Sequence, residues 1–141
     1  MSICGKLTAE IIFDELISKS TISSLEILID IFSDLMNSVA RELKMKNTIF
    51  KNSTGWPDPL QNTSSRDLSI LALNLINKFP DLYKMFAEIS FTYNGIKQGN
   101  RNPILYNNLV FGADGLKTGH TQESGYGLVA SAKRNNLRFI L

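Results

Sequence analysis

The chain has 141 residues and a formal net charge of +2, and 43% of its residues are hydrophobic and 20% charged. This composition is ordinary for a soluble globular domain, and the charge is too small to indicate binding to nucleic acid or to an anionic membrane. A single cysteine, Cys4, excludes an intrachain disulfide, and a single histidine, His120, offers no metal-ligand cluster, so no cofactor is predicted. No apolar run reaches the roughly 20 residues of a transmembrane helix.

The first 24 residues carry a weak helical pattern and no secretory signal. Thr8 is a candidate cap for a short helix, and four apolar residues lie at helical spacing: Leu7, Ile11, Ile12 and Leu16. The acidic residues Glu10, Asp14 and Glu15 interrupt the apolar core that a signal peptide requires. We therefore expect a chain expressed in this form to remain in the cytoplasm.

A clear amphipathic helix is predicted from residue 25 to residue 43, with Ser24 as its candidate N-cap. Its apolar face, which we interpret as core, contains Leu25, Leu28, Ile29, Phe32, Met36, Val39, Ala40 and Leu43. Residues 44–63 are rich in Asn, Ser, Gly and Pro, which predicts irregular structure. We interpret Trp56 as an anchor of this loop, with stacking of its ring on a ligand as the alternative.

A second helix is predicted after Ser64, its N-cap, and Asp67 three residues later completes a capping-box pattern. The predicted buried stripe consists of Leu68, Leu71, Ala72, Leu75, Ile76 and Phe79. Pro80 either ends this helix or begins the next turn of helix, which is predicted for residues 81–88.

The second half of the chain is typical of short strands and tight turns. Asn94-Gly95, between Phe91–Tyr93 and Ile96–Gln98, predicts a β-hairpin because both turn residues tolerate positive φ. A polar loop at residues 99–102 follows. Three further elements are expected: an extended segment at Ile104–Tyr106, a turn at Asn107-Asn108, and a turn at Asn135-Asn136 before a strand at Leu137–Leu141.

Two strands joined by a tight turn are predicted at Asp114–Thr121 and Gly125–Ala132. The first contains Lys117-Thr118-Gly119, which we name the Lys-Thr-Gly segment. Lysine supplies a positive charge and threonine a hydroxyl, while glycine leaves the backbone open to a ligand lying along the strand. The segment is therefore a candidate binding edge for an extended peptide that ends in a carboxylate.

The longer run around this segment resembles the low-molecular-mass penicillin-binding proteins, the serine-type D-Ala-D-Ala carboxypeptidases of bacterial cell-wall metabolism. The resemblance covers roughly residues 28–141 and also includes Met36-Asn37, Ala40, Leu43, Met45–Gly55, Ser65–Leu68, Phe91–Gln98 and Asn100–Asn102. It implies an α/β (α+β) fold with helices packed on an antiparallel sheet, as part of a β-lactamase-like transpeptidase domain. Residues 25–141 would be a partial catalytic domain, truncated at both ends, after a divergent segment of residues 1–24.

The resemblance also implies the roles of five residues. Lys117 would face the terminal carboxylate of a peptidoglycan stem peptide ending in D-Ala-D-Ala, and the Thr118 hydroxyl would bind it. Gly119 would let the peptide lie on the strand, and the His120 backbone N–H would be an oxyanion donor. Arg101 would be a further contact to the carboxylate. The alternatives are a solvated turn residue for His120 and a surface loop charge for Arg101.

The family's hydrolase activity needs two more motifs, a Ser-x-x-Lys that supplies nucleophile and base and a Ser-x-Asn. Neither occurs in these 141 residues, so no catalytic residue is assigned. Three hypotheses stay open: a decayed product without activity, a non-catalytic module that binds the peptide, and one half of a split enzyme. β-Lactams would bind only when another chain completes the site, and the family resemblance implies a periplasmic or otherwise extracytoplasmic location.

The missing nucleophile generates the first prediction. The purified chain should form no stable adduct with a labelled penicillin, because a serine without an activating base is a weak nucleophile. The measurement is intact-protein mass spectrometry after incubation with the label. A stoichiometric adduct mapped to any serine of the chain would show that the nucleophile is present after all.

Overall fold

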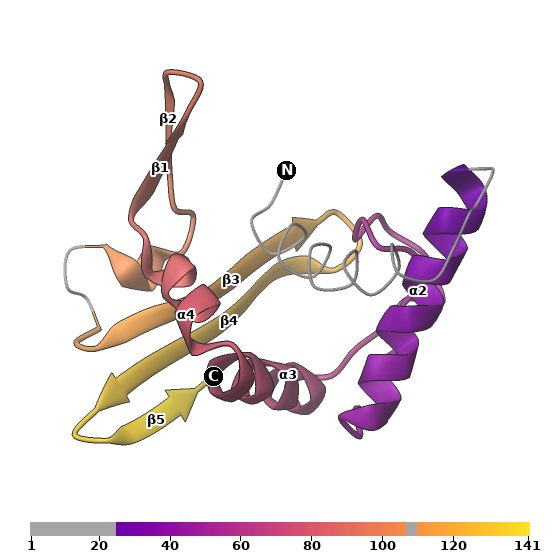
Figure 1. Ribbon diagram of the computed structural model, residues 1–141, viewed down its shortest axis with the longest axis horizontal. Coiled ribbons are helices and arrows are strands. Elements are labelled where there is room, and N and C mark those ends of the chain that lie inside the picture. The colour runs from indigo at the N-terminus through magenta and orange to yellow at the C-terminus, as the bar shows by residue number, and fades with distance from the viewer. Residues whose placement is uncertain (1–24, 107–109) are drawn as a thin grey trace. The chain divides into compact units, whose positions relative to one another are not determined.

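The computed structural model describes residues 25–106 and 110–141 (Figure 1). They belong to two compact units, Met1–Asp67 and Leu68–Leu141. The helical pattern near residues 7–16, the Ser24 cap and the Asn107-Asn108 turn lie outside the described residues. No helix in the described part of the chain is both long enough and apolar enough to cross a membrane.

In the first unit, helix α2 (Leu25–Glu42) confirms the predicted amphipathic helix. Ala40 is buried, with 2% of its surface exposed, and Met45 is buried directly after the helix. Val39 is 38% exposed although it was predicted on the core face. Neighbouring helical positions point about 100° apart, so a face centred on Ala40 leaves Val39 at its border.

The segment after α2 is irregular, as predicted, and is tied to the helix by one side chain. Asn37 Nδ2 donates to the Phe50 carbonyl oxygen at 2.7 Å, and the Phe50 N–H donates to Asn37 Oδ1 at 2.9 Å. The amide thus satisfies both polar groups of one loop residue, as a neighbouring strand would do. A single isolated bridge, Ile49 to Asn62, closes the loop further along.

The ring of Trp56 does not anchor this loop, contrary to our prediction, because 74% of the residue is exposed. The main chain of Trp56 is held instead. Its N–H donates to Asn52 Oδ1 at 3.1 Å, and its carbonyl oxygen accepts from Asn52 Nδ2 at 3.0 Å and from Gln61 Nε2 at 3.3 Å. Side-chain amides therefore supply the order that we attributed to the burial of the indole.

Helix α3 (Ser65–Lys78) begins at its predicted cap, where the Asp67 N–H donates to Ser64 Oγ at 3.1 Å. The Asp67 side chain is 1% exposed. Its Oδ2 accepts from the Asn47 N–H at 2.7 Å and from the Thr48 hydroxyl at 2.8 Å. Ser64 therefore caps the helix, while the Asp67 carboxylate binds the irregular segment at Asn47 and Thr48. Within the predicted stripe Ala72 is fully buried.

The second unit continues with short helices. Pro80 begins α4 (Pro80–Tyr83), and the chain then tightens into the 3₁₀ helix η1 (Lys84–Ala87). The prediction of an extended segment at Ile104–Tyr106 is wrong, because η2 (Pro103–Leu105) is a 3₁₀ turn. The Ile104 N–H donates to Asn102 Oδ1 at 3.2 Å, and the fixed φ of Pro103 suits a first helical position.

Strands β1 (Ser90–Tyr93) and β2 (Ile96–Gly99) form the predicted hairpin, with φ of 50° at Asn94 and 75° at Gly95. Every residue of both strands is exposed, and the hairpin stands away from the three-stranded sheet (Figure 1). Its base is fixed by Asn100, whose Nδ2 donates to the Glu88 carbonyl oxygen at 2.9 Å.

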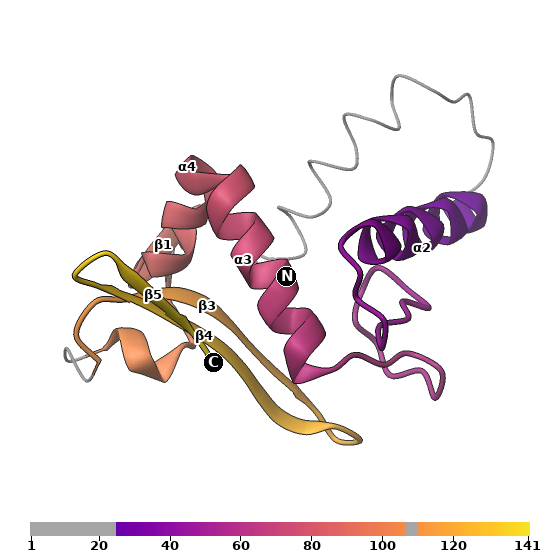
Figure 2. The same cartoon turned by 90° about the horizontal axis from the view of Figure 1, so that it is seen from below.

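An antiparallel sheet in the order β3-β4-β5 forms the body of the second unit. Its strands are β3 (Ala113–Thr121), β4 (Gly125–Arg134) and β5 (Leu137–Ile140). The predicted Asn135-Asn136 turn is confirmed by φ of 46° and 66°. Helix η1 contacts β3, and Figure 2 shows α3 and α4 on one side of the sheet. These elements confirm the predicted α+β class.

At Gly115, strand β3 approaches the short helices α4 and η1 closely. A Cβ at this position would lie 2.4 Å from the Tyr83 hydroxyl oxygen and 3.1 Å from Tyr83 Cζ. Tyr83 and Phe86 are each 5% exposed, with their ring centroids 5.5 Å apart. Because such packed rings cannot retreat without opening a void, only glycine allows β3 to approach this closely.

The contact at Gly115 generates a prediction of stability. Gly115→Ala should lower the free energy of unfolding by about 1–3 kcal/mol, the usual cost of forcing a methyl group into a packed site. Gly127→Ala is the matched control, because a Cβ on that strand glycine meets nothing within 4 Å. The measurement is urea unfolding of both variants followed by circular dichroism. Equal midpoints for the two alanine variants would contradict the packing argument.

Candidate functional site

Strand β3 presents the Lys-Thr-Gly segment on an edge of the sheet. One side of β3 pairs with β4, where Lys117 lies opposite Val129 and Gly119 opposite Gly127. Its other side has no partner strand among the described residues. Gly119 is exposed, and a Cβ there would meet nothing within 4 Å. The backbone of this segment is therefore open to an added strand, as in β-strand addition of a peptide.

Lys117 carries a cation without a carboxylate partner in the described part of the chain. The residue is half-buried, and its Nζ donates to the carbonyl oxygen of the neighbouring Thr118. A backbone carbonyl satisfies one of the three ammonium donors and cancels none of the charge. The positive charge beside the open edge is thus available to an incoming anion.

His120 is a strand residue, so the alternative of a turn residue is wrong. It lies in β3 opposite Tyr126, with the two ring centroids 4.0 Å apart and the planes inclined by 40°. Both residues are exposed, and Tyr126 is 91% exposed. Together they form an exposed aromatic pair next to Gly119.

Arg101 is not joined to the Lys-Thr-Gly segment by any hydrogen bond or ion pair among the described residues. It is exposed, between Asn100 and the buried Asn102, on the loop that leads from β2 into η2. Helix η2 contacts β3, so the loop lies in the same unit as the segment. Four of the five predicted binding residues therefore lie on strand β3, and Arg101 lies on the loop before η2.

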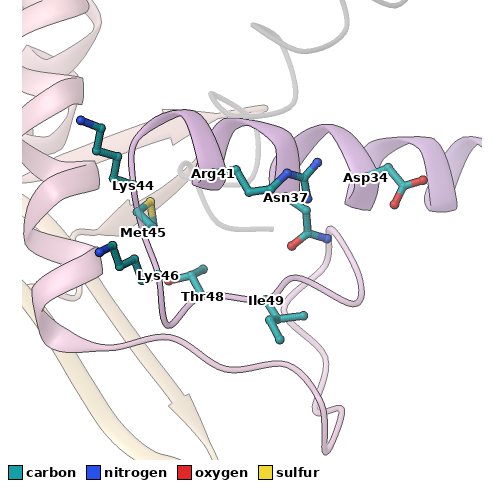
Figure 3. A pocket seen from close by; sticks show the side chains of 8 residues that line it. All are labelled: Asp34, Asn37, Arg41, Lys44, Met45, Lys46, Thr48 and Ile49. Carbon is teal, nitrogen blue, oxygen red and sulfur yellow. The ribbon is translucent and has the colours of Figure 1, made fainter.

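A hollow of about 510 Å³ lies in the first unit, between α2 and the loop that follows it (Figure 3). Its lining contains Asp34, Asn37, Arg41, Lys44, Met45, Lys46, Thr48 and Ile49, and no residue of β3. Lys44 and Lys46 extend away from the other side chains, while Asn37 and Thr48 are engaged in the internal hydrogen bonds described above. The hollow offers no converging set of polar groups.

A second group of side chains, which sequence reasoning missed, lies at the start of β3. We name it the Asp114 network, and it consists of Tyr83, Asp114, Ser131 and Arg138. The Ser131 hydroxyl donates to Asp114 Oδ1 at 2.5 Å and lies 2.6 Å from the Tyr83 hydroxyl. Arg138 Nη1 donates to Asp114 Oδ1 at 2.6 Å and to Ser131 Oγ at 3.0 Å.

The Asp114 network is largely shielded from water. Ser131 is 2% exposed, and the side chains of Arg138 and Asp114 are 22% and 29% exposed. The Arg138 guanidinium also lies 5.7 Å from the centroid of the Tyr83 ring. No spacing in the sequence joins these residues, since they come from α4, β3, β4 and β5 and meet only in the folded sheet.

Comparison with known proteins gives one consistent result. Residues 29–141 match the family model described as D-alanyl-D-alanine carboxypeptidase. The D-alanyl-D-alanine carboxypeptidase DacA of Haemophilus influenzae is 44% identical over 110 residues, which are 77% of this chain and 28% of that protein. DacF of Bacillus subtilis is 36% identical over 116 residues, which again cover 77% of this chain and 28% of that protein. The chain thus spans about 28% of the length of these relatives.

Solved structures show the same likeness. Penicillin binding protein 5 from Haemophilus influenzae matches with a TM-score of 0.73 and 43% identity, over 77% of this chain and 32% of that one. The carboxypeptidase DacD from Francisella tularensis matches with a TM-score of 0.73 and 30% identity, over 77% and 38%. An ampicillin-bound penicillin-binding protein from Listeria monocytogenes matches with a TM-score of 0.69 and 31% identity, over 77% and 46%.

The Asp114 network generates a prediction of pH dependence. Burial raises the pKa of Tyr83 above its ordinary value of 10.0, and the nearby Asp114 carboxylate raises it further, against the Ser131 hydrogen bond and Arg138. The unfolded chain therefore loses this proton first as the pH rises. The stability that Tyr83 contributes is complete below about pH 10 and is lost as the pH rises toward the raised pKa.

Tyr83→Phe removes this titration. The free energy of unfolding of the wild-type chain should therefore fall more steeply between about pH 9 and pH 11 than that of the variant. Urea unfolding at several pH values measures both curves, and titrations common to the two proteins cancel in the difference. Parallel curves would show that Tyr83 ionises alike in the folded and unfolded chains.

Proposed function

The chain belongs to the D-alanyl-D-alanine carboxypeptidase family, and we propose on this premise that it carries the peptide-binding strand of a serine-type D-Ala-D-Ala carboxypeptidase. One observation carries the proposal above the others. Among the described residues, Lys117 has no carboxylate partner and lies beside an unpaired strand edge that Gly119 leaves unobstructed. This is the chemistry that an extended peptide with a terminal carboxylate requires.

Each residue of the strand has a distinct part in the proposed binding. The Lys117 ammonium attracts the terminal carboxylate, and the Thr118 hydroxyl donates a hydrogen bond to it. The strand backbone pairs with the peptide, which lies flat where Gly119 has no side chain. The His120 N–H donates toward the carbonyl oxygen of the scissile bond, where a preorganised donor contributes roughly 3 kcal/mol to transition-state binding once a nucleophile attacks.

In the complete reaction a serine would attack the peptide bond between the two D-alanines, release the terminal D-alanine and leave an acyl-serine that water hydrolyses. The Ser-x-x-Lys and Ser-x-Asn motifs for these steps do not occur in the 141 residues. We assign to this chain only the binding and orientation of the peptide. The ligand would be a peptidoglycan stem peptide, and the place of action outside the cytoplasmic membrane.

The missing motifs favour a second candidate, a chain that binds the stem peptide without cleaving it, either as a remnant or as one half of a split enzyme. The ampicillin-bound Listeria relative supports β-lactam binding in this family. For this chain we propose β-lactam binding only where another polypeptide supplies the serine. Adding a second chain that contains both motifs should then restore a penicillin adduct on that partner, whereas a remnant would gain no activity.

The proposed role of Lys117 leads to a quantitative prediction. A charge-assisted hydrogen bond contributes roughly 1.5–3 kcal/mol. Lys117→Ala should therefore weaken the binding of a D-Ala-D-Ala peptide on the order of 10- to 100-fold, at about 1.4 kcal/mol per decade. Isothermal titration calorimetry of both proteins measures the two dissociation constants.

Lys133→Ala is the matched control, because Lys133 is an exposed lysine of the neighbouring strand β4, opposite Arg138 on β5. Its removal lowers the net charge by the same amount and should leave peptide binding unchanged. If the wild-type chain binds and both lysine variants bind equally well, Lys117 is an ordinary strand lysine and the proposed site fails.

A further inference from the structure

We propose that Arg138 is a positioning residue for the Lys-Thr-Gly segment. It acts through Asp114, by holding the start of β3 in place and by neutralising the carboxylate nearest in sequence to Lys117. The inference rests on the proposed function, since it concerns the orientation of the same strand. Arg138 reaches from β5 past β4 to β3, so one side chain joins all three strands of the sheet.

The start of β3 is the part of the strand that its backbone pairing fixes least. The pairing of β3 with β4 shifts between Ala113, opposite Ala132, and Gly115, opposite Ser131, so that Asp114 falls at an irregularity of the ladder. At such a bulge the backbone hydrogen bonds are locally interrupted and no longer fix the strand. The Asp114 side chain supplies the missing attachment through its hydrogen bonds to Ser131 and Arg138. Lys117 follows three residues later.

Arg138 also compensates a negative charge close to Lys117 in sequence. The half-buried Asp114 carboxylate is paired with Arg138. Removing one partner of a shielded ion pair leaves an uncompensated charge that is costly to keep away from water. Without Arg138 the Asp114 carboxylate would either turn toward the Lys117 ammonium or repel the anionic end of a peptide. Arg138 therefore keeps Lys117 free for the ligand.

The test compares two ligands on each variant: a peptide ending in D-Ala-D-Ala and the same peptide with a C-terminal amide. Arg138→Ala should lower the ratio of carboxylate affinity to amide affinity by about tenfold. A general loss of structure would weaken the binding of both peptides alike and leave the affinity ratio unchanged. Arg134→Ala is the control. Arg134 Nε donates to the Phe111 carbonyl oxygen at 2.7 Å, and this residue does not belong to the Asp114 network.

A rescue variant separates charge from packing. Adding Asp114→Asn to Arg138→Ala removes the unpaired carboxylate, so the affinity ratio should recover to within about threefold of the wild-type value. An Arg138→Ala ratio equal to that of the wild type would overturn the inference. A double variant that recovers nothing would overturn the role of charge, because the loss would then come from the missing attachment of β3.

Hydrogen exchange provides a measurement that needs no ligand. Backbone amides of residues 116–119 should exchange at least about tenfold faster in Arg138→Ala than in the wild-type chain, with those of α3 unchanged. Unchanged exchange in this segment overturns the positioning role, whether or not peptides bind. A wild-type chain that binds neither peptide but shows the expected exchange pattern would refute the proposed function and leave the positioning of the strand standing.

Discussion

A strand that offers its free edge to a ligand has to be held in place without a partner on that side. In the described part of the chain, strand β3 pairs only with β4 and is held further by contacts on its face. Gly115 allows Tyr83 to pack directly against the backbone, and the Asp114 network fixes the strand where its ladder is irregular. Open edge strands are normally a liability that proteins shorten or cover. In the described part of the chain this edge of β3 stays open, and largely buried polar side chains hold the strand in position.

In the first unit, side-chain hydrogen bonds likewise hold a backbone segment that lacks a strand ladder. Asn37 and Asp67 satisfy backbone groups of the irregular segment between the helices, and each does so over more than ten residues of sequence. A buried N–H without a partner is costly, so a loop that runs close to two helices needs such substitutes for a strand ladder. The family resemblance includes the Met36-Asn37 pair, and the hydrogen bonds of Asn37 give that pair a structural reason.

Local patterns in the sequence predicted most of the fold. The hairpin turns at Asn94-Gly95 and Asn135-Asn136, the helix periodicity and the Ser64 cap all depend on neighbouring residues, and all are confirmed. The failures depend on context. Residues 103–105 form the 3₁₀ helix η2, whose first turn is capped by the Asn102 side chain, instead of the extended segment predicted at residues 104–106. The Trp56 ring is exposed, and side-chain amides hold the main chain of this residue instead. In the candidate site, the Lys-Thr-Gly segment could be predicted because its residues are consecutive in the sequence. The Asp114 network could not, because its residues lie up to 55 positions apart, from Tyr83 to Arg138.

Arg138 and Lys117 are two of the cations on this sheet, and their surroundings differ. Arg138 is paired with a carboxylate, shielded and joined to three other side chains, as a residue that stabilises a structure should be. Lys117, only three residues from that carboxylate, has no acidic partner in the described part of the chain and donates to a carbonyl oxygen. Stability alone would favour pairing both charges, because a partly buried ammonium loses hydration without gaining a counter-charge. We therefore propose that a ligand supplies the negative charge opposite Lys117, and that Arg138 keeps the Asp114 carboxylate occupied.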